Sequence, residues 1–188
     1  MAHRVEITAT IEDTRAAVLL DKLHAMGFST LRNVSLANVY TIDGKFDDTQ
    51  LPSAVRLLSD PITEGATVFE TESVQTSFPY SHEFDWAVEI GLQPGVTDNV
   101  GNTAGETIED CVAGFTGQVF SSQVLYLSGD LTEQQAVAIG NSLANTLIER
   151  VSQKSVSSYA LEGGMDVVVP RVQIHETPRV DEVDILLS

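Results

Sequence analysis

The residues that could do chemistry are few and lie far apart in this sequence. The four histidines are His3, His24, His82 and His175. None of them has a ligand-like neighbour at the spacing that metal sites use. The single cysteine, Cys111, has no basic residue beside it to stabilise a thiolate, so we expect a buried and inert thiol. We therefore expect no catalytic residue, no metal ligand and no cofactor in this chain.

The richest local feature is the run from Gln93 to Thr103, which leads from a predicted strand into a predicted helix. A phosphate-binding loop would occupy this position, but no Gly-Lys-Ser/Thr follows and Asp98 would repel a phosphate. A Pro-Gly turn followed by an Asx-type cap at Asp98, Asn99 or Asn102 explains the composition but not the length. The other interpretation is a loop that contacts a partner protein, with these contact residues: Pro94, Gly95, Thr97, Asp98, Asn99 and Gly101.

The charge of the chain limits its partners. The 188 residues include 10 Lys and Arg against 27 Asp and Glu, which gives a net charge of −17. This charge argues against nucleic acid and against an anionic membrane surface, because both are bound by basic residues. Glu106 and Asp110 have the i, i+4 spacing of paired carboxylates, but without a third ligand we expect a solvated helix face.

The sequence also suggests a compartment. No apolar run approaches the roughly 20 residues that a membrane helix needs. The N-terminus alternates polar and apolar residues and lacks the apolar stretch of a signal peptide. One cysteine cannot form an intramolecular disulfide. We therefore expect a cytoplasmic protein, and the 43% of hydrophobic residues is enough for a core.

The first half of the chain predicts a strand, a helix and a second strand. Residues 5–11 alternate apolar and polar side chains, which is typical of a strand with one buried face. A helix capped by Asp13 or Thr14 and closed by Gly27 follows. Its apolar face comprises Ala16, Leu19, Leu20, Leu23 and Met26. Residues 31–42 then predict a long strand, and the pattern allows a break near Ala37-Asn38.

A shorter helix and a strand complete this half. The helix begins at Asp47 or Asp48 and carries Pro52 in its first turn, where a missing N–H costs little. Pro61-Ile62 and residues 66–70 supply the last strand.

The second half repeats the order of these elements. Residues 86–92 predict a strand, residues 103–113 a helix and residues 118–127 a strand. Thr132 and Gln135 have the spacing of a capping box, so a helix begins there. Two further strands are predicted at residues 148–156 and 165–169.

Short similar segments support an internal repeat. Three pairs align: Val5-Glu6-Ile7 with Val88-Glu89-Ile90, Val39-Tyr40 with Leu125-Tyr126, and residues 59–64 with 145–150. The first pair is offset by 83 residues and the others by 86, which predicts an insertion between Pro94 and Gly101 of the second half.

The sequence thus predicts an α+β protein of two tandem β-α-β-(β)-α-β repeats with antiparallel sheets covered by helices. This order is typical of the ferredoxin-like arrangement. The repeats cover residues 1–80 and 81–170, with a joint at 72–84, and the composition of residues 171–188 indicates a solvated strand or linker. A half of this size would bury only about 60–65% of its chain surface alone, so we expect a pseudo-twofold pair with a shared core.

The segment from Phe84 to Gly101 resembles a known family. Its most specific part is Pro94-Gly95-Val96-Thr97-Asp98-Asn99-Val100-Gly101. The segment is similar to the N-terminal region of bacterial phosphoribosylformylglycinamidine synthase, in which two PurS-like units precede the ligase core. Residues 3–11, 38–43, 131–133 and 178–184 are similar too. In the family the last of these segments leads toward the catalytic domains, so the resemblance implies that residues 171–188 are a linker toward a catalytic domain. Asn102 departs from the pattern, because many members carry a basic residue there.

The resemblance implies a non-catalytic assembly domain in de novo purine biosynthesis. Family members convert formylglycinamide ribonucleotide, ATP and glutamine to the amidine, with ATP and magnesium in the ligase core and glutamine in a glutaminase unit. PurS-like units bridge these parts and help ammonia transfer. The implied partners are the ligase core, in the same or a separate chain, the glutaminase unit and, as a further option, a second copy of this chain. The chain alone is expected to have no ligase or glutaminase activity.

The alternative is a ferredoxin-like regulatory domain that binds a small metabolite between its two halves. A pocket at the interface of the halves, with a few convergent polar groups, would indicate this function.

Overall fold

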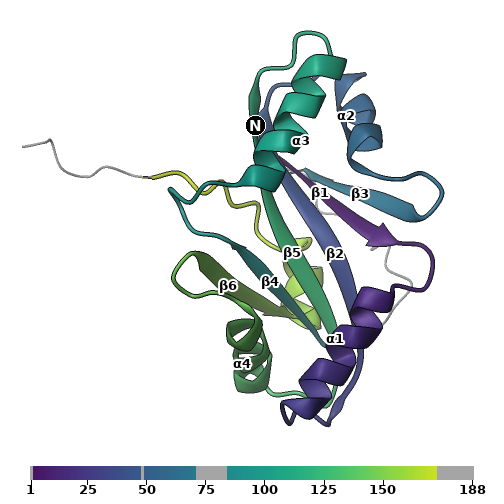
Figure 1. Cartoon of the computed structure of the whole chain (residues 1–188), viewed down its shortest axis with the longest axis vertical. Helices are drawn as coiled ribbons and strands as arrows, with labels where there is room; N and C mark the ends of the chain where they lie inside the picture. Colours follow the sequence, from purple (N-terminus) through teal and green to yellow (C-terminus); the bar gives the residue numbers. More distant parts are fainter. Residues whose placement is uncertain (1, 48, 71–83, 173–188) are drawn as a thin grey trace, which may run out of the picture.

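The computed structural model describes residues 2–47, 49–70 and 84–172. Within them the chain is an α+β protein with one open, six-stranded antiparallel sheet and five helices (Figure 1). The elements are β1 (Ala2–Ala9), α1 (Thr14–Ala25), β2 (Leu31–Gly44), α2 (Gln50–Leu58), β3 (Glu64–Glu70), β4 (Trp86–Leu92), α3 (Asn99–Cys111), β5 (Gly117–Gly129), α4 (Glu133–Leu143), β6 (Glu149–Ser155) and α5 (Val156–Glu162). The strand order is β3-β1-β2-β5-β4-β6.

The two longest strands, β2 and β5, form the centre of the sheet. They pair antiparallel from Leu31↔Gly129 to Gly44↔Gly117, with one irregularity between Leu31 and Asn33. β1 pairs with the second half of β2, and β4 pairs with the second half of β5. The break allowed near Ala37-Asn38 is wrong, because both residues stay in the β2–β5 ladder.

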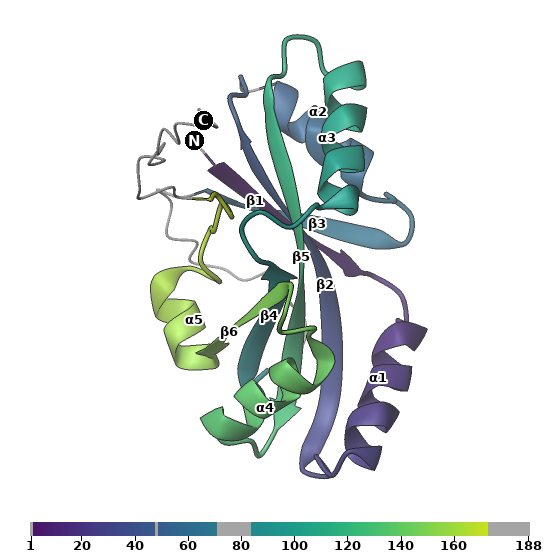
Figure 2. The same cartoon turned by 60° about the vertical axis from the view of Figure 1, so that its left-hand side comes forward.

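Helices cover both faces of the sheet. Helices α1 to α4 contribute to the cores on one face, called the helical face here, whereas α5 contributes to a core on the opposite face. Figure 2 shows α5 separated from the other helices by the sheet. The helical face carries two helix pairs, α1 with α4 and α2 with α3. Each pair combines one helix from the first half of the chain with one from the second half.

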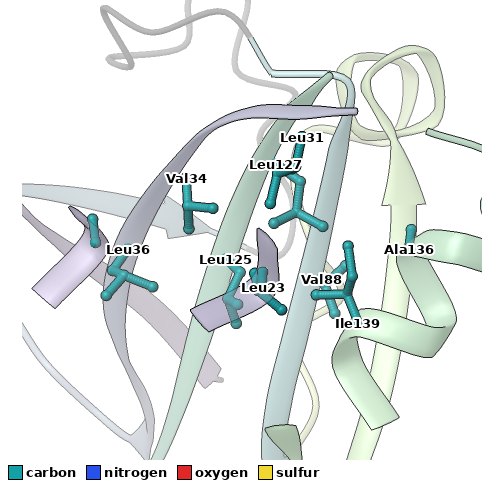
Figure 3. Packing of buried hydrophobic residues seen from close by; sticks show 10 residues of the cluster. Leu23, Leu31, Val34, Leu36, Val88, Leu125, Leu127, Ala136 and Ile139 are labelled. Carbon is teal, nitrogen blue, oxygen red and sulfur yellow. The ribbon is translucent and has the colours of Figure 1, made fainter. Parts of the chain in front are cut away.

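The helix pairs enclose two separate apolar cores. In the first, Leu23 of α1 and Ile139 of α4 share a cluster with Leu125 and Val88 of the sheet (Figure 3). The second joins the other helix pair to the sheet through these residues: Val5, Ile7, Ile42, Ala54, Ala104, Ile108, Val112, Phe115 and Val119. Because each core draws on both halves, neither half contains a complete core of its own.

Local capping sets the helix starts. Asp13 caps α1 and accepts a hydrogen bond from the backbone of Arg15 at 3.0 Å, and Thr132 and Gln135 form the predicted capping box of α4. The second helix begins at Gln50 with Thr49 as its N-cap residue, and Asp47 accepts from the backbone of both at 2.8 and 2.9 Å.

Two further predictions need correction, and one helix was not predicted. The helix predicted for residues 103–113 begins four residues earlier, at Asn99. Residues 165–169 are not a strand. Helix α5 was not predicted, although Ser155 caps it and Gly163 ends it with a φ of 74°, a conformation that favours glycine. Of the predicted joint, residues 72–83 lie outside the described residues.

Candidate functional site

The buried carboxylate of Asp98 fixes the loop that precedes α3 through hydrogen bonds. This residue caps α3, and its Oδ1 accepts from the Gly101 N–H at 2.7 Å and from the Ser121 hydroxyl at 2.8 Å. Its Oδ2 accepts from the Ser121 N–H at 2.5 Å. Asp98 is buried, so one carboxylate joins the loop, the helix and strand β5.

Gly101 permits a close approach between α3 and β5. A Cβ atom at this position would collide with the backbone oxygen of Val119 and lie 2.7 Å from Asp98 Oδ2. Of the predicted contact residues, Asp98 and Gly101 are therefore buried and hold the fold. The other four are exposed: Pro94, Gly95, Thr97 and Asn99.

A groove lies on the helical face over the centre of the sheet. It encloses about 650 Å³ and has Asn38 and Tyr40 of β2 and Ser121 and Gln123 of β5 in its floor. Its walls come from both halves: Leu19, Ile90, Val100 and Leu143, with Asp98, Asn99 and Glu149 beside them. Asn38 pairs directly with Gln123, and Tyr40 with Ser121. This polar floor separates the two apolar cores.

A buried charged cluster lies on the opposite face. The Arg4 guanidinium donates from Nε to Glu6 Oε1 at 2.7 Å and contacts Glu89 Oε2 at 3.0 Å. Tyr126 donates to Glu6 at 2.5 Å, and Ser122 donates to Glu89 at 2.7 Å. Burial alone would lower the pKa of Arg4, but the two carboxylates outweigh it and the net effect is a raised pKa. Arg4 is therefore charged.

Sequence reasoning missed this cluster. Glu6 was expected on the solvent side of a strand with one buried face, yet it is fully buried. The signal was present, because the repeated Val-Glu-Ile segment places a glutamate at the same position in β1 and β4. β2 and β5 separate these strands in the sheet, so the Arg4–Glu89 ion pair spans the centre of the molecule.

The turns before the two edge strands have the same hydrogen bonds. Asp60 accepts from the Ile62 N–H at 2.8 Å, and its own N–H donates to Glu64 at 2.9 Å. Asn145 accepts from the Leu147 N–H at 3.2 Å, and its N–H donates to Glu149 at 2.6 Å. Each turn leaves a large aliphatic side chain in solvent, Ile62 at 83% and Leu147 at 87% exposure.

The remaining candidates do not converge. Among the described residues, no group of three or more His, Cys, Asp or Glu side chains could hold a metal ion. His24 contacts the Leu31 carbonyl oxygen at 2.7 Å, and His82 and His175 lie outside the described residues. The prediction of a buried thiol is wrong, because Cys111 is exposed. Glu106 and Asp110 are exposed, as predicted.

No protein-family model and no curated protein matches the chain. In the part of the chain that the structure describes, none of the helices has the length and apolar character needed to cross a membrane.

Gly101→Ala should lower the free energy of unfolding by about 1–3 kcal/mol, because the added methyl group meets backbone and a fixed carboxylate. The matched control is Gly105→Ala in the same helix, whose Cβ would lie 3.6 Å from Val119 Cγ2, an ordinary contact. This control should leave stability unchanged or raise it by up to about 1 kcal/mol. Urea unfolding measures both, and equal effects would contradict the close packing.

Arg4→Met should destabilise the chain by about 3–5 kcal/mol, because it leaves the buried carboxylates of Glu6 and Glu89 without their cation. Arg15→Met is the control, since Arg15 forms an exposed ion pair with Asp13, and its cost should be at most about 1 kcal/mol. A cost for Arg4→Met no larger than that of the control, again by urea unfolding, would show that the cluster does not contribute as described.

Proposed function

We propose that the chain is a non-catalytic assembly domain of a phosphoribosylformylglycinamidine synthase, built from two tandem PurS-like repeats. In this role it bridges the ligase core and the glutaminase unit and helps ammonia transfer. The observation that carries the proposal is the pair of matching turns, each with an exposed aliphatic side chain, at the two outer strands of the sheet.

The register of the strands supports the repeat. Val5 pairs with Tyr40 and with Val68, whereas Val88 pairs with Leu125 and with Gln153. The offset is thus 83 residues in the first strands and 85 in the others. The offset of 86 from the sequence is wrong by one residue, an error that would turn every side chain to the other face of the sheet.

The two-residue difference falls in the predicted loop. The caps Asp13 and Asp98 are themselves 85 residues apart. Three residues separate Ala9 from Asp13, whereas five separate Leu92 from Asp98. The extra residues therefore belong to the exposed loop at Pro94, Gly95 and Thr97, which remains a candidate for partner contact.

The positions of the two turns suit a bridge. Thr10 donates to Thr63 of the first turn at 2.9 Å, and Gln93 donates to Ile148 of the second at 2.8 Å. The turns therefore adjoin β3 and β6, the strands at opposite edges of the sheet (Figure 1). When a partner covers aliphatic side chains that are exposed to this degree, the removal of their apolar surface from water favours binding. Two such contact sites on opposite edges of the sheet can bind two separate partner proteins.

A second candidate function is the regulatory domain that binds a small metabolite. The observation that favours it is the groove over the β2–β5 ladder, where polar side chains of both halves converge.

The assembly proposal is tested by sedimentation of this chain with the ligase core and glutaminase from the same genome. We expect one complex that contains all three parts. Ile62→Asp and Leu147→Asp should each release a different partner, with affinity at least about tenfold weaker, because a charge would enter a buried contact. Leu161→Asp is the control, since Leu161 on α5 is 82% exposed but lies in neither turn.

The absence of any complex at concentrations well above those in the cell would contradict the assembly function. A complex that forms equally well with both turn variants would place the contacts elsewhere. Circular dichroism of the variants should match the original chain, because both side chains are in solvent.

A further inference from the structure

We infer that the central groove binds a small neutral molecule with a carboxamide-type edge, a planar group in which a hydrogen-bond donor lies beside an acceptor. This inference gives a ligand chemistry to the regulatory function and rests on that second candidate alone. It does not depend on the assembly proposal.

The first argument is the unused hydrogen-bonding capacity of the floor. The side-chain amides of Asn38 and Gln123 and the hydroxyl of Tyr40 have no hydrogen bond to the described residues, although all three side chains are half-buried. Burial, together with the negative charges of Glu64 and Asp98, raises the pKa of Tyr40, so its hydroxyl is protonated and can donate. The floor therefore offers donors and acceptors side by side.

The second argument is the pattern of the sheet. On the helical face β2 presents Val34, Leu36 and Ile42, and β5 presents Val119 and Leu125. Asn38 and Gln123 interrupt both apolar rows at the same cross-strand pair. Apolar side chains packed over them would leave these polar groups without hydrogen bonds, which is unfavourable, and the groove lies open between the helix pairs. A ligand with matching polar atoms can fill it without this cost.

The third argument is charge. The residues that line the groove include two carboxylates, Asp98 and Glu149, and no basic side chain. Each carboxylate accepts hydrogen bonds from backbone N–H groups, Asp98 from Gly101 and Glu149 from Asn145. An anionic ligand would be repelled, so the groove favours a ligand without negative charge, and the donor and acceptor pattern of the floor suits a neutral carboxamide-type edge.

The fourth argument is size and shape. A volume of about 650 Å³ lies in the range of pockets for small molecules. Apolar side chains from three helices and β4, Leu19, Val100, Leu143 and Ile90, form walls beside the polar floor. A flat ring between such walls, with its polar edge toward Asn38 and Gln123, would satisfy both surfaces.

The experiment is a titration of the ¹⁵N-labelled full chain, followed through the side-chain NH₂ signals of Asn38 and Gln123. Nicotinamide and adenine are the probes, since one offers a carboxamide and the other a nucleobase edge. Nicotinate is the matched control because it has the size of nicotinamide but carries a negative charge. We expect at least one neutral probe to shift both amide signals at concentrations up to about 1 mM, and nicotinate to shift neither.

Variants locate the binding. Gln123→Leu and Asn38→Leu should weaken binding by about tenfold or more, and Tyr40→Phe should weaken it while conserving shape. Gln118→Leu is the control, because Gln118 is exposed on the same strand with its side chain on the opposite face. If a leucine variant does not fold, the signals of the original chain and Tyr40→Phe decide the question.

The inference is overturned if neither neutral probe shifts the two amide signals, if nicotinate binds as well as nicotinamide, or if Gln118→Leu weakens binding as much as Gln123→Leu. Failure of the probes would leave the assembly function unaffected, because that function is measured with the partner chains.

Discussion

The antiparallel pairing of β2 and β5 is the constraint on which the other features depend. The two strands run beside each other from Leu31↔Gly129 to Gly44↔Gly117 and join the halves of the chain into one sheet. β1 and β4 each pair with only half of a central strand, and helices α1 and α3 contact β2 and β5. The helices meet across the junction, so α1 shares a core with α4 and α2 shares one with α3.

Charge and polarity at this junction differ between the two faces. On the opposite face, Arg4 holds Glu6 and Glu89 together across the central strands, and Tyr126 and Ser122 satisfy the remaining carboxylate oxygens. On the helical face, Asn38 and Gln123 have no such partners among the described residues and face a groove. Buried polar groups are costly when unpaired, so the first arrangement fixes the register and the second remains open to a ligand. The alternation of faces along β2 and β5 produces both.

The sequence predicted those elements whose signals are local. The apolar period of residues 16–26, the cap at Asp13 and the capping box at Thr132 were enough for α1 and α4. Asp98 was named among the cap residues, but its second role as the acceptor for Ser121 depends on a contact 23 residues away. Helix α5 was missed because its seven residues are too short for a period, and only Ser155 and Gly163 mark its ends.

Tertiary pairing explains the larger gaps. The groove exists because Asn38 lies opposite Gln123, and nothing in the sequence predicted that β2 and β5 pair with each other. Glu6 alternates with apolar residues, which is also typical of a solvent-facing side chain, and only the sheet order brings Glu89 and Arg4 to it. Glu6 and Glu89 were visible in the two similar Val-Glu-Ile segments, but their meeting at the centre of the sheet required the strand pairing.

The most direct test of a shared core is native-state hydrogen exchange along the whole described chain. The account predicts that amides of the β2–β5 ladder, such as those of Val39 and Val124, are among the best protected. Amides in the core of α1 and α4 and amides in the core of α2 and α3 should exchange with the same opening free energy, because each core contains parts of both halves. Loss of protection in β1, α1 and β3 at a lower free energy than in β4, α4 and β6 would contradict it, since the halves would then unfold separately.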